Sequence, residues 1–193
     1  MKKQLYIFFI VLISGCSQCN LTNQIIIENG KLPDSALLYI PYQDGEIYKF
    51  KHSNGLVVNF STYRKTTDEI TGCVEYCKYE THYQKNSTNL YPDYPIFDIN
   101  LEINNLDTNY IFCSAFIAKS SFIIPTGNNN FENVKKMDSV LIDTVYYKDV
   151  FKIKANYYSY IDESISVDSM YYNYEFGILK IIITNDETYT IYK

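Results

Sequence analysis

The sequence predicts a mainly β protein, either an antiparallel β-sandwich or an open barrel, with little helix. Strand-length segments in which apolar and polar residues alternate recur along the 193-residue chain, and clusters of turn residues separate them. The composition agrees, because 21 tyrosines and many β-branched residues suit the half-buried surface of a pleated sheet. Strands with one apolar face must bury that face against other strands, which leads to a sandwich or a barrel.

The first 15 residues predict an export signal rather than a part of this fold. Lys2 and Lys3 precede an apolar run over residues 5–13, and the small residues Ser14 and Gly15 follow it. A helix that spans a membrane needs about 20 apolar residues. The run is therefore too short to remain as a membrane span.

The end of this signal, Ile13-Ser14-Gly15-Cys16, resembles the lipobox of bacterial lipoproteins. The resemblance implies that residues 1–15 are removed and that Cys16 becomes the N-terminus, with a thioether-linked diacylglycerol and usually an N-acyl chain. Two or more acyl chains give a stable anchor, whereas one is marginal. Two other interpretations stay open: an ordinary cleaved signal peptide and an uncleaved hydrophobic N-terminus.

The remaining chain is expected to consist of a lipidated tether, residues 16–23, and a single β-rich domain, residues 24–193. No internal repeat, low-complexity tract or linker divides these residues. A chain of this length is typical of one domain and can bury a sizeable core.

A hairpin is predicted over residues 46–62, where Asn54 and Gly55 mark the turn. A two-residue turn would mix polar and apolar side chains on each face. A three-residue loop over residues 53–55 avoids this mixing, and it gives Gly55 the left-handed conformation that such a loop requires. The loop aligns Tyr48, Phe50 and His52 with Leu56, Val58 and Phe60.

The clearest strand is predicted over residues 96–103, and a second hairpin over residues 177–192. In the strand, Phe97, Ile99, Leu101 and Ile103 point to one face, while Asp98, Asn100 and Glu102 point to the other. In the hairpin, a turn over residues 185–187 makes Leu179, Ile181 and Ile183 face Tyr189 and Ile191.

Further strands are expected between these elements, at residues 71–83, 110–118, 139–145 and 149–155. Residues 129–137 predict a helix of one or two turns, because Phe131, Val134 and Met137 recur at a spacing of three.

Two parts of the chain are similar to segments of small lipoproteins of Bacteroidota: LLYIPYQDGEIYKFKHSNG (residues 37–55), and VYYKDVFKI followed by MYYNYEFGILKI and TYTIY (residues 145–192). In that family an aliphatic-Pro-Tyr motif and a Gly turn lead into an alternating strand. Nearer the end, an aromatic-rich strand passes through Gly into an aliphatic strand and a last hairpin. The resemblance implies a β fold in the cell envelope and brings no catalytic residue.

The cysteines do not predict a metal site. Cys73 and Cys77 share a face of an extended strand but lie about 13 Å apart, and His82 points to the opposite face, whereas zinc ligands lie about 2.0–2.3 Å from the ion. Disulfides are more usual in an exported protein, and Cys113 is the expected partner of Cys73 or Cys77. Free, buried thiols stay an equal alternative.

No catalytic constellation is predicted, and hence no cofactor and no enzyme. Asp98 and Glu102 share a face, but about 13 Å separates their backbones, more than the about 5–10 Å of a glycosidase pair. Neither His52 nor His82 has an acidic or serine neighbour at a catalytic spacing, and no nucleophile elbow or phosphate-binding loop occurs.

The formal net charge of −5 and the absence of a basic patch argue against a nucleic-acid partner. The expected partners are the membrane, through Cys16, and a protein or glycan that the sequence does not identify. Residues 17–21 contain no Asp or Glu. In Bacteroidota lipoproteins an acid-rich stretch here is associated with export to the cell surface, so the resemblance implies an outer-membrane lipoprotein that faces the periplasm.

Tyrosines gather in two clusters, at residues 157, 158 and 160 and at residues 171, 172 and 174. Adjacent strand residues point to opposite faces, so about half of these rings would be exposed, where they could stack on sugars or anchor a protein. Packing across neighbouring strands is the alternative.

These observations predict a lipid-anchored, non-enzymatic envelope protein that acts as a binding or structural module. The alternative is an envelope carrier that holds an apolar ligand in an open barrel. Residues such as Phe97, Leu101 and Phe112 would then line its cavity.

Overall fold

The computed structural model of the 193-residue chain describes residues 25–72, 79–107, 109–127, 131–156 and 166–192. In these residues almost all regular structure is β-strand, with a single helical turn, so the predicted mainly β fold with little helix is confirmed. The predicted signal peptide and tether lie outside the described residues.

The described residues form a short helix, α2 (Asp34–Leu37), and twelve strands. The strands are β1 (Ile25–Glu28), β2 (Ile47–His52), β3 (Val57–Gly72), β4 (Tyr79–Pro92), β5 (Ile99–Asp107), β6 (Tyr110–Ile117), β7 (Ser120–Ile124), β8 (Val134–Ile142), β9 (Val145–Lys154), β10 (Val167–Asn173), β11 (Gly177–Ile183) and β12 (Thr188–Tyr192).

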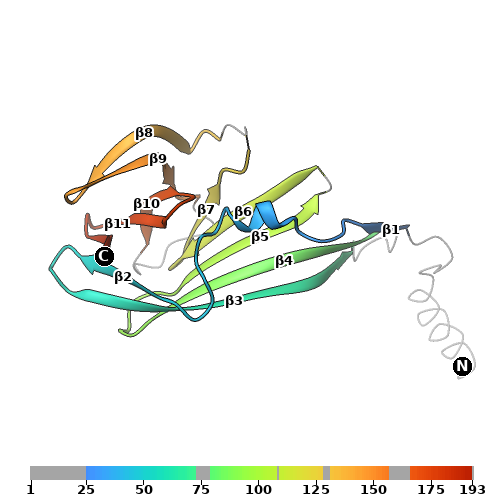
Figure 1. Cartoon of the computed structure of the whole chain (residues 1–193), viewed down its shortest axis with the longest axis horizontal. Helices are drawn as coiled ribbons and strands as arrows, with labels where there is room; N and C mark the ends of the chain where they lie inside the picture. The colour runs from blue at the N-terminus through green and yellow to red at the C-terminus, as the bar shows by residue number, and fades with distance from the viewer. Residues whose placement is uncertain (1–24, 73–78, 108, 128–130, 157–165, 193) are drawn as a thin grey trace, which may run out of the picture.

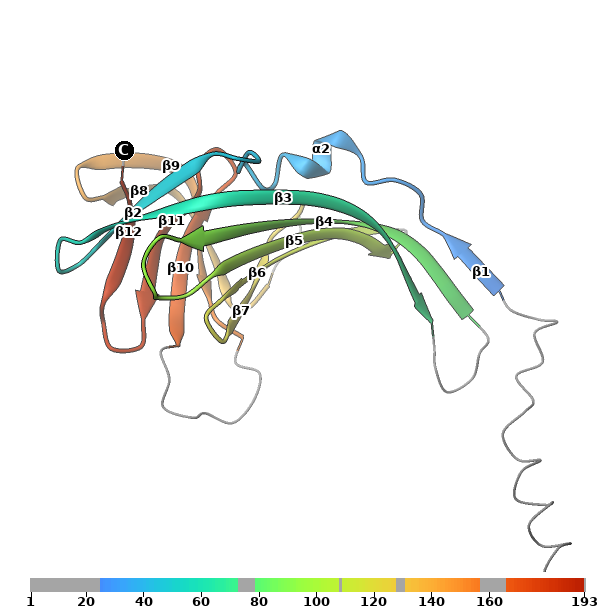
Figure 2. The ribbon, with the colours of Figure 1, turned by 90° about the horizontal axis from the view of Figure 1, so that it is seen from below.

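All of these strands belong to one sheet, antiparallel except at β1, that curls into a half-barrel (Figures 1 and 2). Their order is β7-β6-β5-β4-β3-β2-β12-β11-β10-β9-β8, and β1 adds to β4 in parallel. The central neighbours β2 and β12 come from opposite ends of the domain, with Phe50 opposite Ile191.

The curl brings β7 close to the far half of the sheet. Ser121 forms an isolated bridge with Asn156. The hydroxyl of Ser120 donates to the carbonyl oxygen of Val167 (3.0 Å) and accepts the Val167 N–H (2.8 Å). In the described residues a few bonds, rather than a continuous ladder, therefore join β7 to the strands across the half-barrel.

The inner face of the sheet carries the main hydrophobic core. The segment between β1 and β2 crosses this face and covers it with Leu32, Ala36, Ile40 and Tyr42. Beneath them, the strand residues that are almost completely buried include Phe50, Val58, Phe60, Leu90, Ile99, Leu101, Ile103, Phe122, Ile153, Met170 and Ile181. A smaller cluster joins the β8–β9 hairpin to β11 through Ile142, Tyr147, Val150 and Leu179.

Arg64 on β3, the only arginine of the sequence, holds the segment between β1 and β2 on the sheet through hydrogen bonds. Its guanidinium donates to the carbonyl oxygens of Leu37, Ile40 and Tyr42 at 3.0–3.1 Å, and to the side-chain oxygen of Asn86 at 2.9 Å. The last carbonyls of a helix have no partner within the helix. The planar fork of arginine reaches the last helix carbonyl, that of Leu37, together with two carbonyls of the following loop. Partial burial lowers the pKa of Arg64.

Tyr42 packs directly on Gly177, at the start of β11. Its hydroxyl oxygen accepts the N–H of Ile178 at 2.7 Å. A Cβ atom at Gly177 would lie 2.5 Å from the tyrosine ring, and Gly177 has a φ of +76°. Both the close approach and the left-handed backbone therefore require glycine at this position.

The predicted β2–β3 hairpin is confirmed in its register and its loop. Phe50 lies opposite Val58, and Tyr48 lies opposite Phe60. The N–H of His52 donates to the carbonyl oxygen of Leu56 at 2.7 Å, which closes a three-residue loop, and Gly55 has a φ of +97°.

The C-terminal hairpin differs from the prediction by two residues, because Ile181 lies opposite Tyr189 rather than Ile191. The Ile183 N–H donates to the carbonyl oxygen of Glu187 at 2.9 Å, so the loop spans residues 184–186. Asp186 takes the left-handed conformation (φ +67°), which aspartate tolerates better than most residues. A β-bulge at Leu179 also turns this side chain away from the main core, which Ile178 joins instead.

One other prediction is wrong, one is correct only in part, and one falls partly outside the described residues. Residues 134–137, predicted as helix, belong to β8, because β9 offers a complete pairing partner. Of the strand predicted over residues 139–145, residues 139–142 end β8 and Val145 begins β9, and a turn at residues 143–144, where Asp143 takes a φ of +52°, divides it. The strand predicted over residues 71–83 is divided between the end of β3 and the start of β4, and residues 73–78 are not described.

Candidate functional site

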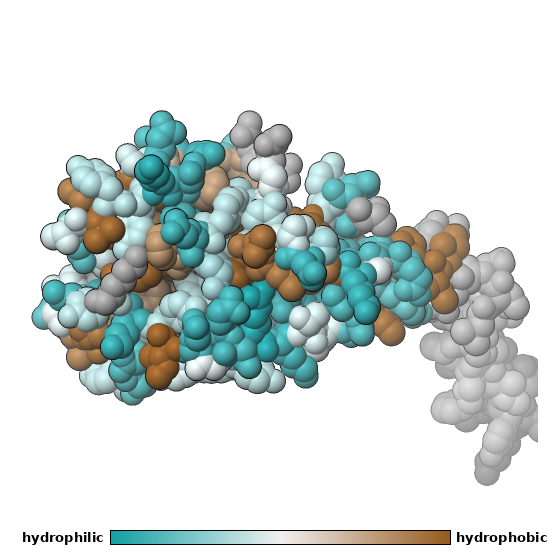
Figure 3. Space-filling view, viewed as in Figure 1, coloured by the Kyte–Doolittle hydropathy of each residue, from teal (hydrophilic) through white to brown (hydrophobic). Residues whose placement is uncertain are grey.

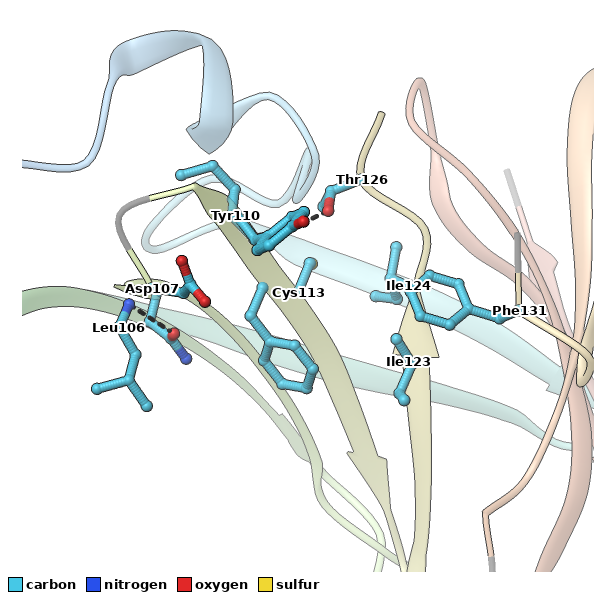
Figure 4. Close-up of a pocket in the computed structure, with 11 residues that line it drawn as sticks. Leu106, Asp107, Tyr110, Cys113, Ile123, Ile124, Thr126 and Phe131 are labelled. Atoms are coloured by element: carbon cyan, nitrogen blue, oxygen red, sulfur yellow. Dashed lines mark hydrogen bonds between the residues drawn. The ribbon is translucent and has the colours of Figure 1, made fainter. Parts of the chain in front are cut away.

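A cavity of about 510 Å³ lies at the end of the sheet where β5, β6 and β7 meet the loop after β7 (Figure 4). Apolar side chains make up most of its lining. The lining residues are Asn104, Leu106, Asp107, Tyr110, Ile111, Phe112, Cys113, Ile123, Ile124, Thr126 and Phe131.

The strand register explains how residues of both sheet faces reach this cavity. Cys113 lies opposite Ile103 and Ile124, on the inner face, whereas Phe112 points to the outer face. The cavity sits at the sheet corner, so it is lined by Cys113 and Ile124 from one face and by Phe112 and Ile123 from the other.

Two hydrogen bonds hold the loop after β7 in place beside the cavity. The hydroxyl of Thr126 donates to the carbonyl oxygen of Ile111, and the hydroxyl of Tyr174 donates to that of Pro125 at 2.7 Å. Further along the chain than this hydrogen-bonded loop, Phe131 lies beside Ile124 (Figure 4). The wall that the loop contributes is therefore fixed by hydrogen bonds from β6 and from the end of β10.

Three polar side chains of the lining, those of Asn104, Asp107 and Thr126, already form local hydrogen bonds. The amide oxygen of Asn104 accepts the N–H of Leu106 at 3.2 Å, and a carboxylate oxygen of Asp107 accepts the N–H of Asn109 at 2.8 Å. Thr126 donates to Ile111, as described above. Burial of a polar ligand group without a partner is unfavourable, so the cavity suits an apolar group.

The rim of the cavity exposes large apolar side chains, which normally mark contact sites when they are contiguous. Phe112 is 45% exposed, and Leu106 and Tyr110 are also exposed. Phe116 offers an internal comparison, because it lies on the same face of β6 and is 44% exposed but does not line the cavity.

The three residues expected to line a barrel cavity do not lie together. Phe97 and Leu101 belong to the buried main core, whereas Phe112 points to the opposite face of the sheet. The expectation was wrong because the inner position of β6 opposite Ile103 is Cys113, one residue beyond Phe112. A one-residue difference reverses the face of a strand side chain.

The predicted cysteine sites are only partly within the described residues. Cys113 is buried in β6, and burial raises the pKa of its thiol. Cys16, Cys73 and Cys77 lie outside the described residues. Lipidation of Cys16 and a disulfide between Cys113 and Cys73 or Cys77 therefore stay predictions.

His82 has acidic partners that the sequence analysis missed. Its Nε2 lies 2.6 Å from a carboxylate oxygen of Glu80, and its Nδ1 lies 3.0 Å from one of Glu28. The bond with Glu80, together with the charge of Glu28, raises the pKa of His82. Glu80 lies two residues before His82 in the same strand, so alternation alone could have placed the two side chains on one face. Glu28 belongs to β1, and its contact with His82 depends on the pairing of β1 with β4, which sequence spacing does not reveal.

His52 is a buried sheet residue beside the main core. Its Nδ1 accepts the N–H of Asn54 at 3.3 Å, and its ring packs on Tyr189 with the centroids 4.6 Å apart. These contacts give His52 a structural role at the β2–β3 loop.

The second tyrosine cluster packs within the protein, as the alternative interpretation expected. Tyr172 is buried and its hydroxyl donates to the carbonyl oxygen of Tyr39, and the hydroxyl of Tyr174 donates to that of Pro125. Tyr171 is half-buried beneath the ammonium group of Lys152. The first cluster, at residues 157, 158 and 160, lies outside the described residues.

Across the described residues, no group of three or more His, Cys, Asp or Glu side chains is placed to hold a metal ion. The described part of the chain also has no helix of the length and apolarity that a membrane crossing requires. No protein-family model, curated protein or solved structure matches the chain.

Proposed function

We propose that this protein is a lipid-anchored envelope protein that binds an apolar group, without catalysis, in the cavity between β5, β6 and β7. The observation that carries the proposal is the cavity of about 510 Å³ with a mostly apolar lining. Cavities of about 300–1,000 Å³ with mostly apolar linings are typical of sites that bind small molecules.

The anchor part of the proposal rests on the lipobox-like end of the signal, with acyl chains on Cys16 in the outer membrane and the domain in the periplasm. The seven tether residues, 17–23, span at most about 25 Å when extended. The cavity would thus act close to the membrane surface.

The volume of the cavity also favours a second candidate, a carrier that holds a small apolar molecule. The two candidates differ in the occupant. A binding module would hold an apolar side chain of a protein partner, whereas a carrier would retain a free ligand through purification.

Phe112 provides the direct test of the cavity, and Phe116 provides its matched control. We expect the neutral fluorophore 1-aminoanthracene to bind the wild-type protein and the Phe116→Ser variant equally. Phe112→Ser should bind about tenfold more weakly, because burial of an aromatic side chain contributes roughly 1.5–3 kcal/mol. Both side chains are nearly half exposed, so neither substitution should lower the melting temperature by more than a few degrees. Equal binding by both variants would contradict the proposed site.

The same variants separate the two candidates. A small molecule that native mass spectrometry finds on wild type and Phe116→Ser, but not on Phe112→Ser, identifies a carrier. A protein that the same two forms capture from gently solubilised membranes, and that Phe112→Ser does not capture, identifies a binding module. If Phe112→Ser behaves like wild type in both assays, the cavity is not the binding site.

A further inference from the structure

β1, β4 and β3 form a three-stranded arm that extends beyond the half-barrel (Figure 2). β5 pairs with β4 only over residues 85–90 of β4. Nearer the start of β4, β1 takes the place of β5, with Ile25 opposite Tyr79 and Glu28 opposite His82. On the other side, β3 continues along β4 to Gly72. The arm end is defined here as residues 25–28, 69–72 and 79–82.

The arm end exposes four isoleucines, Ile25, Ile26, Ile27 and Ile70, which are between 38% and 64% exposed. Figure 3 shows apolar residues gathered at this end of the molecule, whereas polar residues cover much of the neighbouring surface of the arm. Single exposed apolar residues are common, but several together at one projecting end mark a contact surface.

The register distributes these isoleucines over both faces of the arm. Ile26 lies opposite Glu80 and Ile70 lies opposite His82, which places both on the face that continues the inner face of the sheet. Ile25 and Ile27 alternate with Ile26 and therefore point to the other face. A sheet that packs on a single protein neighbour needs apolar side chains on one face only, whereas the exposed isoleucines of the arm end lie on both faces.

We propose that the arm end is a membrane-contact surface whose isoleucines enter the interfacial region of the lipid bilayer. The inference rests on the proposed anchor, because the eight residues from 17 to 24 connect Cys16 to Ile25. Fully extended, they reach at most about 29 Å. The chain thus enters the domain, a few residues after the proposed acylation site, at the same end that carries the exposed isoleucines.

Charge determines the kind of bilayer that the arm end prefers. Glu28 and Glu80 contact a single histidine, His82, on one face of the arm. On the other face Glu69 lies 3.7 Å from the neighbouring Lys85. This surface is acidic, so attraction to anionic headgroups does not contribute. Contact is therefore expected with zwitterionic phosphatidylcholine, and anionic lipid should weaken it at low salt.

The absence of tryptophan from the sequence makes the contact measurable. Ile26→Trp and Ile70→Trp each place a single tryptophan at the arm end. Ile47→Trp on β2 is the matched control, since Ile47 is 61% exposed but lies outside the arm. The acylated full-length variants are reconstituted into vesicles of phosphatidylcholine or of its brominated form, and the tryptophan is excited selectively.

Quenching by brominated lipid and a blue shift of the emission are expected for Ile26→Trp and Ile70→Trp, and neither is expected for Ile47→Trp. Replacement of part of the lipid by phosphatidylglycerol should reduce the quenching. If acylated Ile26→Trp and Ile70→Trp are not quenched, the membrane contact is refuted and the anchor stands. Burial of both tryptophans in a detergent-resistant dimer without quenching would also refute it. If mass spectrometry finds no acyl group on Cys16 and the arm tryptophans are still quenched, the anchor fails and the contact stands.

Discussion

Asn29 and Asn105 hold each other's backbones through their side chains. The amide of Asn29 donates to the carbonyl oxygens of Asn105 (2.8 Å) and Leu106 (2.6 Å), and the amide of Asn105 donates to those of Asn29 and Gly30 (both 3.0 Å). Leu106 belongs to the rim of the cavity. This pair therefore fixes the end of the arm strand β1 relative to the proposed binding site.

Removal of the Asn105 side chain should destabilise the protein. Asn105→Ala deletes the two donated bonds and the bond that its oxygen accepts from the Gln84 N–H at 2.8 Å. Buried groups left without partners cost about 1–3 kcal/mol each, so we expect a loss of about 2 kcal/mol or more by urea denaturation. Asn100→Ala removes one bond from a half-buried residue and should cost less than about 1 kcal/mol. Equal costs would show that the Asn29–Asn105 pair adds no special stability.

Two glycines with left-handed backbones should respond differently to alanine. Gly55 has open space around it, so Gly55→Ala should cost about 1 kcal/mol through backbone strain alone. Gly177→Ala adds a clash with the ring of Tyr42 and should cost at least about 3 kcal/mol. Thermal and urea denaturation of the two variants measure the difference. A cost for Gly177→Ala no larger than that for Gly55→Ala would contradict the close packing of Tyr42.

The attachment of β1 should weaken as the pH rises. Glu80 and Glu28 raise the pKa of His82 above its ordinary value of 6.5. Protonated His82 therefore stabilises the folded arm, fully below about pH 6.5 and progressively less as the pH passes through the raised pKa. Hydrogen-exchange protection factors of β1 amides should fall between pH 5.5 and pH 8.5. In His82→Gln this fall should disappear, and an unchanged pH dependence in that variant would exclude His82 as its cause.

Acylation of the chain should depend on Cys16 alone. Cys16→Ala removes the thiol that the lipobox resemblance assigns to the diacylglycerol, so the variant should remain an unprocessed precursor. Metabolic labelling with a clickable fatty acid measures this directly. Cys19→Ala should keep the label, because Cys19 is not preceded by the small-residue exit of the signal. Equal labelling of wild type and Cys16→Ala would rule out Cys16 as the acylated residue.

The strands and the first hairpin could be predicted because their signals are local. Alternation placed Ile99, Leu101 and Ile103 on the buried face, and the position of Gly55 selected the correct loop. The second hairpin shows the limit of the same reasoning, since Asp186 takes a left-handed conformation that glycine more commonly provides. At β8, apolar residues recur at a spacing of three, which favours a helix over a few residues. Pairing with β9 outweighs this local preference, and such pairing depends on the tertiary structure.

The candidate site could not be predicted for a related reason. Its lining combines residues of β5, β6 and β7, taken from both faces of the sheet, with Phe131, which lies beyond the turn at Pro125. Neither the curl of the sheet nor the bond from Thr126 to the Ile111 carbonyl leaves a periodic signal in the sequence. The partner of His82 on β1 was missed likewise, because 54 residues separate Glu28 from His82.

The pairing of β2 with β12 has a consequence for the time at which the protein can fold. These neighbours in the middle of the sheet join residues 49–52 to residues 189–192. Until β12 has been synthesised, β2 and β11 each lack a partner on one side, and the two halves of the sheet cannot join. Contacts of such long sequence separation form late and slowly. The two halves of the sheet can each form from neighbouring strands, but the complete sheet can close only once β12 is available to join them.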